Sequence, residues 1–118
     1  MKIKTSELTG AALDWAVAKC EGKNSDWEIH AGNILYGRAT TGFINYKPST
    51  DWSQGGPIIE RERISVISDA REIEGESWMA ENYDGFCMRF GQTTLIAAMR
   101  CYVASKLGDE VEIPEGFK

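Results

Sequence analysis

The central residues 48–62 hold the side chains with the greatest capacity for chemistry. Asp51, Glu60 and Glu62 supply carboxylates, which can serve general acid–base catalysis or metal-assisted hydrolysis. The Gly55-Gly56 pair lets the backbone come close to a ligand, and a helix that starts behind two glycines offers free N–H groups to an anion. The composition of this segment therefore permits a small-molecule site, above all for an anionic ligand.

The same segment can also be explained as scaffold. Asp51 can close a turn, and Trp52 can be buried as an anchor. Pro57 suits the first position of a short helix that runs through Glu62. The alternating charges of residues 60–63 are more typical of an exposed surface than of a catalytic pair, and no P-loop motif is present. We therefore assign no catalytic residue and keep six residues as a binding hypothesis: Asp51, Trp52, Gln54, Gly55, Gly56 and Glu60.

Metal and thiol chemistry find little support in the sequence. His30 is the only histidine, which excludes a metal site built from several histidines. Three cysteines without a C-x-x-C pair fit neither a disulfide framework nor a zinc site. We therefore expect Cys20, Cys87 and Cys101 to be reduced thiols, and we expect no metal and no cofactor.

The charge of the chain argues against polyanionic partners. Residues 1–59 carry six basic and six acidic side chains, whereas residues 60–118 carry seven basic and twelve acidic ones, so the net charge of -5 arises in the second half. Acidic surfaces repel phosphate backbones and anionic lipids, and we expect neither nucleic acid nor a membrane as partner. The acidic stretch from Asp69 to Asp84 predicts a solvated face or, alternatively, a docking surface for a basic partner.

One helix is expected near the start of the chain, from about Ser6 to Cys20, because apolar residues recur there at helical spacing. Thr5 or Ser6 can cap its start, and Gly22 can end it. Its narrow polar stripe comprises Glu7, Asp14 and Glu21.

A second helix is expected from about Thr94 to Lys106, with Thr93 as N-cap and Gly108 as stop. Arg100 is its only charged residue before position 106, which predicts a helix covered on most sides. We expect the two helices to pack directly through faces of small residues, with Ala11, Ala12 or Ala16 against Ala97, Cys101 or Ala104.

The remaining chain predicts a small antiparallel sheet. Asp84-Gly85 suits a tight turn between strands at residues 77–81 and 86–90, and residues 64–67 and 111–113 can add two further strands. Residues 22–56 show no sustained period, although 34–36 and 42–46 are candidate strands joined at Thr40-Thr41-Gly42. The expected fold is α+β, a single domain over residues 1–118 with two main helices packed on a small antiparallel sheet.

Three blocks of the sequence resemble, in the same order, the NinX-like family of small proteins from lambdoid phages. They are KTSELTGAALDWAVA at residues 4–18, PSTDWSQGGPIIERE at residues 48–62 and LIAAMRCYVASKLGDEV at residues 95–111. Thr94 stands where family members tend to have proline, and residues 63–90 match less distinctly. The resemblance implies an accessory phage protein, with no activity, cofactor or catalytic residue to carry over. Since no signal peptide or apolar span is evident, we expect it in the cytoplasm of the bacterial host.

These observations favour a non-catalytic module that binds a host or phage protein through the segment Asp51 to Glu62, and self-association is a further option for its partner. The alternative is a small-molecule-binding or hydrolytic protein that uses Asp51, Gln54, the Gly55-Gly56 amides and Glu60. Convergence of these groups in a concave pocket beside Trp52 would favour the alternative, whereas a flat exposed surface would favour the binding module.

Overall fold

The computed structural model of the chain describes residues 1–22, 27–30, 33–38, 42–73, 75–85 and 87–115. Side chains are described outside residues 27–44 and 69–74. The elements in chain order are β1 (Lys2–Lys4), a 3₁₀ turn (Thr5–Glu7), α1 (Gly10–Cys20), β2 (Trp27–His30), β3 (Asn33–Arg38), β4 (Gly42–Asn45), α2 (Trp52–Glu62), β5 (Ser65–Ile73), β6 (Glu76–Glu81), β7 (Met88–Gly91), α3 (Thr94–Leu107) and β8 (Glu110–Glu112). The α+β class predicted from the sequence is confirmed.

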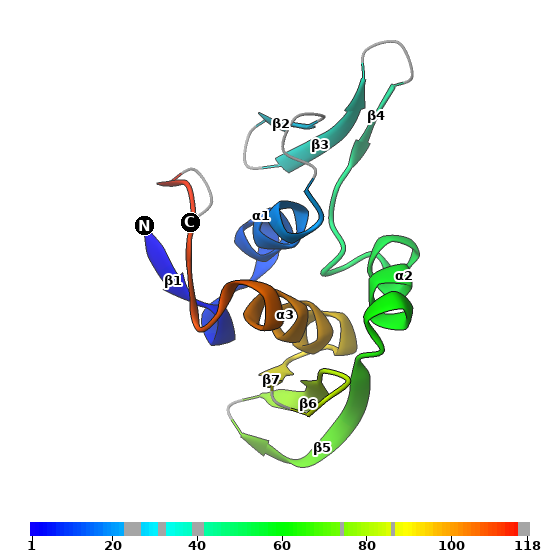
Figure 1. Cartoon of the computed structure of the whole chain (residues 1–118), viewed down its shortest axis with the longest axis vertical. Helices are drawn as coiled ribbons and strands as arrows, with labels where there is room; N and C mark the ends of the chain where they lie inside the picture. The colour runs from blue at the N-terminus through cyan, green and yellow to red at the C-terminus, as the bar shows by residue number, and fades with distance from the viewer. Residues whose placement is uncertain (23–26, 31–32, 39–41, 74, 86, 116–118) are drawn as a thin grey trace.

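Helix α3 lies at the centre of the fold, between α1 on one side and the sheet β5-β6-β7 on the other, with α2 alongside (Figure 1). Its start is fixed by the Thr93 hydroxyl, which accepts a hydrogen bond from the N–H of Ile96 at 3.1 Å. Its end is Gly108, whose positive φ of 88° suits glycine. Residues 97–104 are all buried, so the predicted boundaries and the predicted central position are both confirmed.

Helix α1 starts four residues later than the sequence predicts. Thr9 is the N-cap residue, and its side chain makes no capping bond. Thr5 is buried and serves another purpose, because its N–H and its hydroxyl both donate to the carbonyl of Asp109, at 2.8 and 3.3 Å. The expected capping by Thr5 or Ser6 is therefore wrong. Gly22 ends the helix as predicted, with a φ of 70°.

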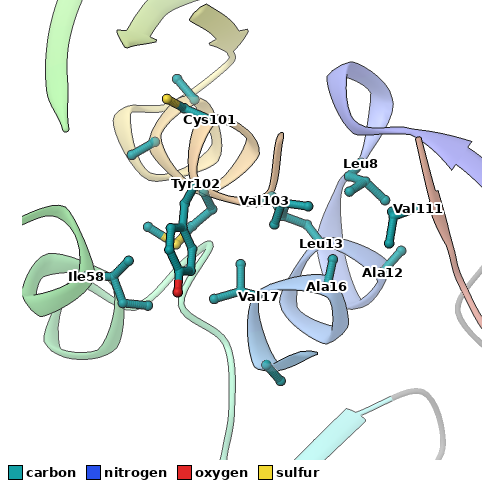
Figure 2. Packing of buried hydrophobic residues seen from close by; sticks show 14 of the residues in the cluster. Leu8, Ala12, Leu13, Ala16, Val17, Ile58, Cys101, Tyr102, Val103 and Val111 are labelled. Carbon is teal, nitrogen blue, oxygen red and sulfur yellow. The ribbon is translucent and has the colours of Figure 1, made fainter. Parts of the chain in front are cut away.

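The expected direct packing of the two helices is confirmed, but through other faces. Leu13 and Val17 of α1 point toward Val103 of α3, whereas Cys101 points toward the sheet (Figure 2). Ala97 also lies on the sheet side, because a Cβ added at Gly91 would approach its backbone nitrogen to 2.5 Å. Gly91, which has no Cβ, thus lets β7 approach the backbone of α3 closely at Ala97.

Within the described residues the strands form three antiparallel sheets, β1-β8, β2-β3-β4 and β5-β6-β7. The predicted hairpin is confirmed, with Glu81 opposite Met88 and Gly85 at a φ of 77° in its turn. The strand expected near residue 111 is present as β8, but it pairs with β1 and does not extend the hairpin sheet. The turn expected at Thr40-Thr41 lies outside the described residues, and β3 and β4 flank it as predicted.

A buried guanidinium joins α3 to two other parts of the chain. Arg100 is 4% exposed, and its Nε donates to the carbonyl of Leu8 at 2.8 Å. Its Nη1 donates to the carbonyl of Phe90 at 2.7 Å and lies 3.3 Å from Oε2 of Glu76. Glu76 belongs to the acidic stretch from Asp69 to Asp84, so at least one carboxylate of that stretch pairs with a buried side chain. The proposed acidic docking surface stays a prediction, because the side chains of residues 69–74 lie outside the described part.

Candidate functional site

Asp51 is the N-cap of α2, as the sequence suggests. Its Oδ1 accepts hydrogen bonds from the N–H of Ser53 at 2.9 Å and from the Ser53 hydroxyl at 2.7 Å. These two bonds, with the side-chain bond the larger cause, hold the pKa of the Asp51 carboxyl below its usual range. The carboxylate therefore accepts hydrogen bonds from the first turn of its own helix, which is a structural role.

Gln54 fastens α2 to the chain that leaves β4. Its Oε1 accepts a hydrogen bond from the N–H of Lys47 at 2.7 Å, and its Nε2 donates to the carbonyl of Asn45 at 2.9 Å. Both ends of the side-chain amide are therefore engaged within the chain.

Gly55 faces the interior of the molecule. A Cβ at this position would lie 2.4 Å from the carbonyl oxygen of Pro48 and 2.7 Å from Cδ2 of Leu95. The sequence predicts a close backbone approach at the glycine pair, and at Gly55 the approaching group is the chain itself.

Trp52 and Pro57 lie elsewhere than expected. Helix α2 begins at Trp52, so Pro57 is inside the helix and is not its first residue. Trp52 is 56% exposed, and the expectation of a buried anchor is wrong. The reason is the cap: since Asp51 opens the helix, Trp52 takes the first position and points away from the core.

The other three residues of the predicted site, Trp52, Gly56 and Glu60, lie together on one exposed surface of α2. Trp52, Gly56 and Glu60 are four residues apart and share a face of the helix. A Cβ at Gly56 would lie 3.8 Å from Cε3 of Trp52, so the indole edge lies beside the glycine. We name this surface the α2 outer face, and its residues are Trp52, Ser53, Gly56, Pro57 and Glu60.

The opposite side of α2 is held by an ionic network that sequence patterns did not reveal. Arg61 donates to both carboxylate oxygens of Glu21, the C-cap residue of α1, at 3.1 and 2.6 Å. The hydroxyl of Tyr102 on α3 donates to the same carboxylate at 2.5 Å, and its ring lies between Ile58 and Val17 (Figure 2). Burial and then the Glu21 carboxylate raise the pKa of the Tyr102 hydroxyl above its usual range. Three helices are thereby fixed relative to one another.

A second feature that the sequence did not reveal is a buried carboxyl. Asp14, expected on a polar stripe, is 6% exposed and accepts a hydrogen bond from the N–H of Ser49 at 2.9 Å. Burial raises its pKa to about 6, although the Ser49 hydrogen bonds and the Lys47 charge offset part of that rise. No local signal marks this pair, because its members are 35 residues apart.

A hollow beside β7 does not favour an anionic ligand. This hollow has a volume of about 490 Å³ and carries two basic and three acidic side chains. Arg89, one of the basic ones, is paired with Asp109 at 2.8 Å. The charged residues of the lining are Lys4, Glu76, Arg89, Asp109 and Glu110. Acidic groups therefore outnumber basic ones, which disfavours an anionic ligand.

Two further properties concern the described part of the chain alone. It contains no group of three or more histidine, cysteine, aspartate or glutamate side chains placed to hold a metal ion. No helix within it has the length and apolar character that crossing a bilayer requires.

Comparison with known proteins connects this geometry to a family. No curated protein matches the chain. A family model described as Bacteriophage P22, NinX matches residues 4–106, a span that includes α1, α2 with its whole outer face, and α3 up to its last residue but one. The chain thus belongs to the NinX family of phage proteins.

Proposed function

We propose that this phage protein acts by binding a host or phage protein through the α2 outer face, without catalysis. The observation that carries the proposal is the position of Trp52, which is 56% exposed on the first turn of a helix. Tryptophan is among the residues that most often dominate binding energy at protein interfaces, because its large rigid ring buries much area at little cost in entropy.

The support beneath this tryptophan is rigid. Asp51 caps the helix, Gln54 ties it to the chain after β4, and Arg61 ties its far end to Glu21 of α1. A binding residue on a preorganised helix loses less conformational freedom on association than one on a mobile loop. The interactions within the chain therefore favour presentation of Trp52 to a partner.

The outer face also indicates what such a partner must offer. Gly56 has no side chain beside the indole, so a partner can approach the ring closely there. Glu60 is exposed two turns further along the same face and adds a negative charge at the rim. A protein with an apolar pocket for the indole and a lysine or arginine near Glu60 fits these features.

The alternative small-molecule or hydrolytic function is less well supported. It requires Asp51, Gln54, the Gly55 amide and Glu60 to converge on a ligand. Asp51 and Gln54 are engaged within the chain and Gly55 faces Pro48, while Glu60 lies on the outer face. The groups that the chemistry needs are thus directed to different places.

Affinity capture from phage-infected host cells, followed by calorimetry with the purified partner, tests the proposal. Trp52→Ala should weaken binding by about 30-fold or more, in line with the loss typical of a central aromatic anchor. Tyr83→Ala is the matched control, since Tyr83 is 72% exposed on the hairpin turn, and its ring lies against Arg63 at the C-terminal end of α2, outside the α2 outer face. This variant should leave the affinity unchanged. Equal affinity of Trp52→Ala and the unaltered chain would refute the proposal. Sedimentation of the purified chain shows whether a second copy is the partner.

A further inference from the structure

Cys87 and Cys101 lie against each other although they are fourteen positions apart in the sequence. The thiol of Cys101 on α3 is 3.5 Å from the carbonyl oxygen of Cys87, and the thiol of Cys87 is 3.8 Å from the carbonyl oxygen of Cys101. Each side chain therefore reaches the backbone of the other residue. This reciprocal arrangement places both sulfur atoms in the same space between α3 and the start of β7.

The surrounding structure holds both residues in place. Asn82 donates its N–H to the carbonyl of Cys87 at 3.0 Å and accepts the N–H of Cys87 at its Oδ1, at 2.9 Å. Cys101 is fully buried on the side of α3 that faces the sheet (Figure 2). Cys87 is half-buried and Cys101 is fully buried, so an external reagent meets Cys87 first.

The two thiols differ in their chemistry. Burial raises the pKa of the Cys101 thiol to about 12, and the neighbouring Cys87 contributes further to that rise. Glu81 acts in the same direction, whereas Arg89 acts against it. Cys101 thus stays a protonated thiol at neutral pH, and a reaction with an external oxidant must begin at Cys87.

We propose that Cys87 and Cys101 are a site of reversible oxidation, at which a peroxide converts the two thiols into an intrachain disulfide. The Cys87 thiolate attacks one peroxide oxygen, the O–O bond breaks, and hydroxide leaves as Cys87 becomes a sulfenic acid. The Cys101 sulfur then attacks the Cys87 sulfur, and the sulfenic hydroxyl leaves with the Cys101 proton as water. The hydroxide takes up the proton that Cys87 released when it ionised, so both sulfur atoms are oxidised and the peroxide is reduced to two molecules of water.

The bond would join the end of the hairpin to α3 and close a loop that contains β7 and the first two turns of the helix. Such a cross-link reduces the conformational freedom of the unfolded chain, so the oxidised protein should melt at a higher temperature than the reduced one. The site is therefore a covalent device that alters the stability of the sheet side of the fold and is independent of the α2 outer face.

A chain that carries Cys20→Ser decides the proposal, because Cys87 and Cys101 are then its only cysteines. After treatment of the reduced, folded protein with hydrogen peroxide, we expect both thiols to resist alkylation and peptide mass spectrometry to identify a Cys87–Cys101 cross-link. Dithiothreitol should restore both thiols and the lower melting temperature. In guanidinium chloride the same variant should form the cross-link more slowly, by a factor of about ten or more, since the fold no longer holds the sulfur atoms together.

Two single variants test the order of the steps. Cys101→Ser should accumulate a Cys87 sulfenic acid that dimedone captures, whereas Cys87→Ser should leave Cys101 unmodified. If Cys101→Ser fails to fold, Cys101→Ala serves in its place, and the Cys20→Ser result stands by itself. Two alkylatable thiols in the folded, peroxide-treated Cys20→Ser chain would overturn the proposal, and so would cross-links between chains in place of one within the chain.

Discussion

The Asp14 carboxylate on α1 accepts a hydrogen bond from the backbone N–H of Ser49, 2.9 Å from its Oδ1. Through this bond α1 holds the segment that leads from β4 into α2, so a buried acid takes part in positioning the α2 outer face. Ser49 is 2% exposed. Water has little access to the pair, which is why burial dominates the pKa of Asp14.

Asp14 should make the stability of the protein depend on pH between about 4 and 6. Its pKa is about 6 in the folded chain against 3.8 for the free side chain. In that interval the folded state keeps a proton that the unfolded state has lost, so the free energy of unfolding should fall as pH rises, by up to about 3 kcal/mol in total. Asp14→Asn keeps the acceptor oxygen but cannot ionise, so it should remove this slope and be the more stable chain at pH 7.5. Urea midpoints at pH 4, 5, 6 and 7.5 measure the effect.

Asp51 offers an internal comparison for this experiment. Its pKa is lowered by the Ser53 hydrogen bonds, so its stabilising contribution is present above the unfolded pKa of 3.8 and is lost as pH falls below it. Asp51→Asn should therefore alter the profile at the acidic end and leave the slope between pH 4 and 6 in place. The same slope in Asp14→Asn as in the unaltered chain would show that another group titrates there.

Sequence patterns predicted the parts of the fold that local chemistry determines. Helix α3 is the clearest case, because Thr93, Gly108 and an uncharged run between them are all local signals. The start of α1 was not predictable in this way. Thr5 has the composition of a cap, but it bonds to Asp109, 104 residues away, and no local pattern contains that information.

The candidate site shows the same division. The turn-forming role of Asp51 was predictable from its residue type, and the structure places it as the N-cap. The exposure of Trp52 was not, because glycines disfavour a helix interior and Pro57 suggested a later start. The contact of Gly55 with Pro48 overrides that propensity, since only a residue without a Cβ permits the observed approach.

Arg100 should be among the residues most sensitive to substitution. It is 4% exposed and donates to the carbonyls of Leu8 and Phe90. Arg100→Met would leave these acceptors and the Glu76 carboxylate unsatisfied, so we expect a loss of about 3 to 5 kcal/mol in the free energy of unfolding. Arg61→Met is the matched control: Arg61 is half exposed, and its loss should cost about 1 kcal/mol or less. Guanidinium titrations of both variants provide the comparison, and similar midpoints would contradict this account.

Substitutions at Asp51 and Glu60 should affect different properties, the first mainly stability and the second mainly binding. Asp51→Ala removes the cap of α2 and should lower the melting temperature, and it should weaken binding per folded molecule far less than Trp52→Ala does, because the indole is still present. Glu60→Ala removes an exposed charge from the α2 outer face and should weaken binding of a basic partner without an effect on melting. Thermal melts and calorimetry with the captured partner check both outcomes. Loss of stability and binding in strict proportion for both variants would mean that the segment is scaffold alone.

The adjacent glycines of α2 should respond in opposite ways to the same substitution. Each Gly→Ala change favours a helix by about 1 kcal/mol. At Gly56 the new methyl group would meet Trp52 at 3.8 Å, an ordinary contact, so the variant should be more stable. At Gly55 it would lie 2.4 Å from the Pro48 carbonyl, and the displacement required should outweigh the gain and destabilise the chain by about 1 to 3 kcal/mol. Gly56→Ala should nevertheless weaken partner binding, because its methyl group occupies the α2 outer face beside the indole. Urea midpoints that move in the same direction for both variants would show that this packing of α2 is wrong, and a more stable Gly56→Ala chain with unchanged affinity would place the binding surface elsewhere.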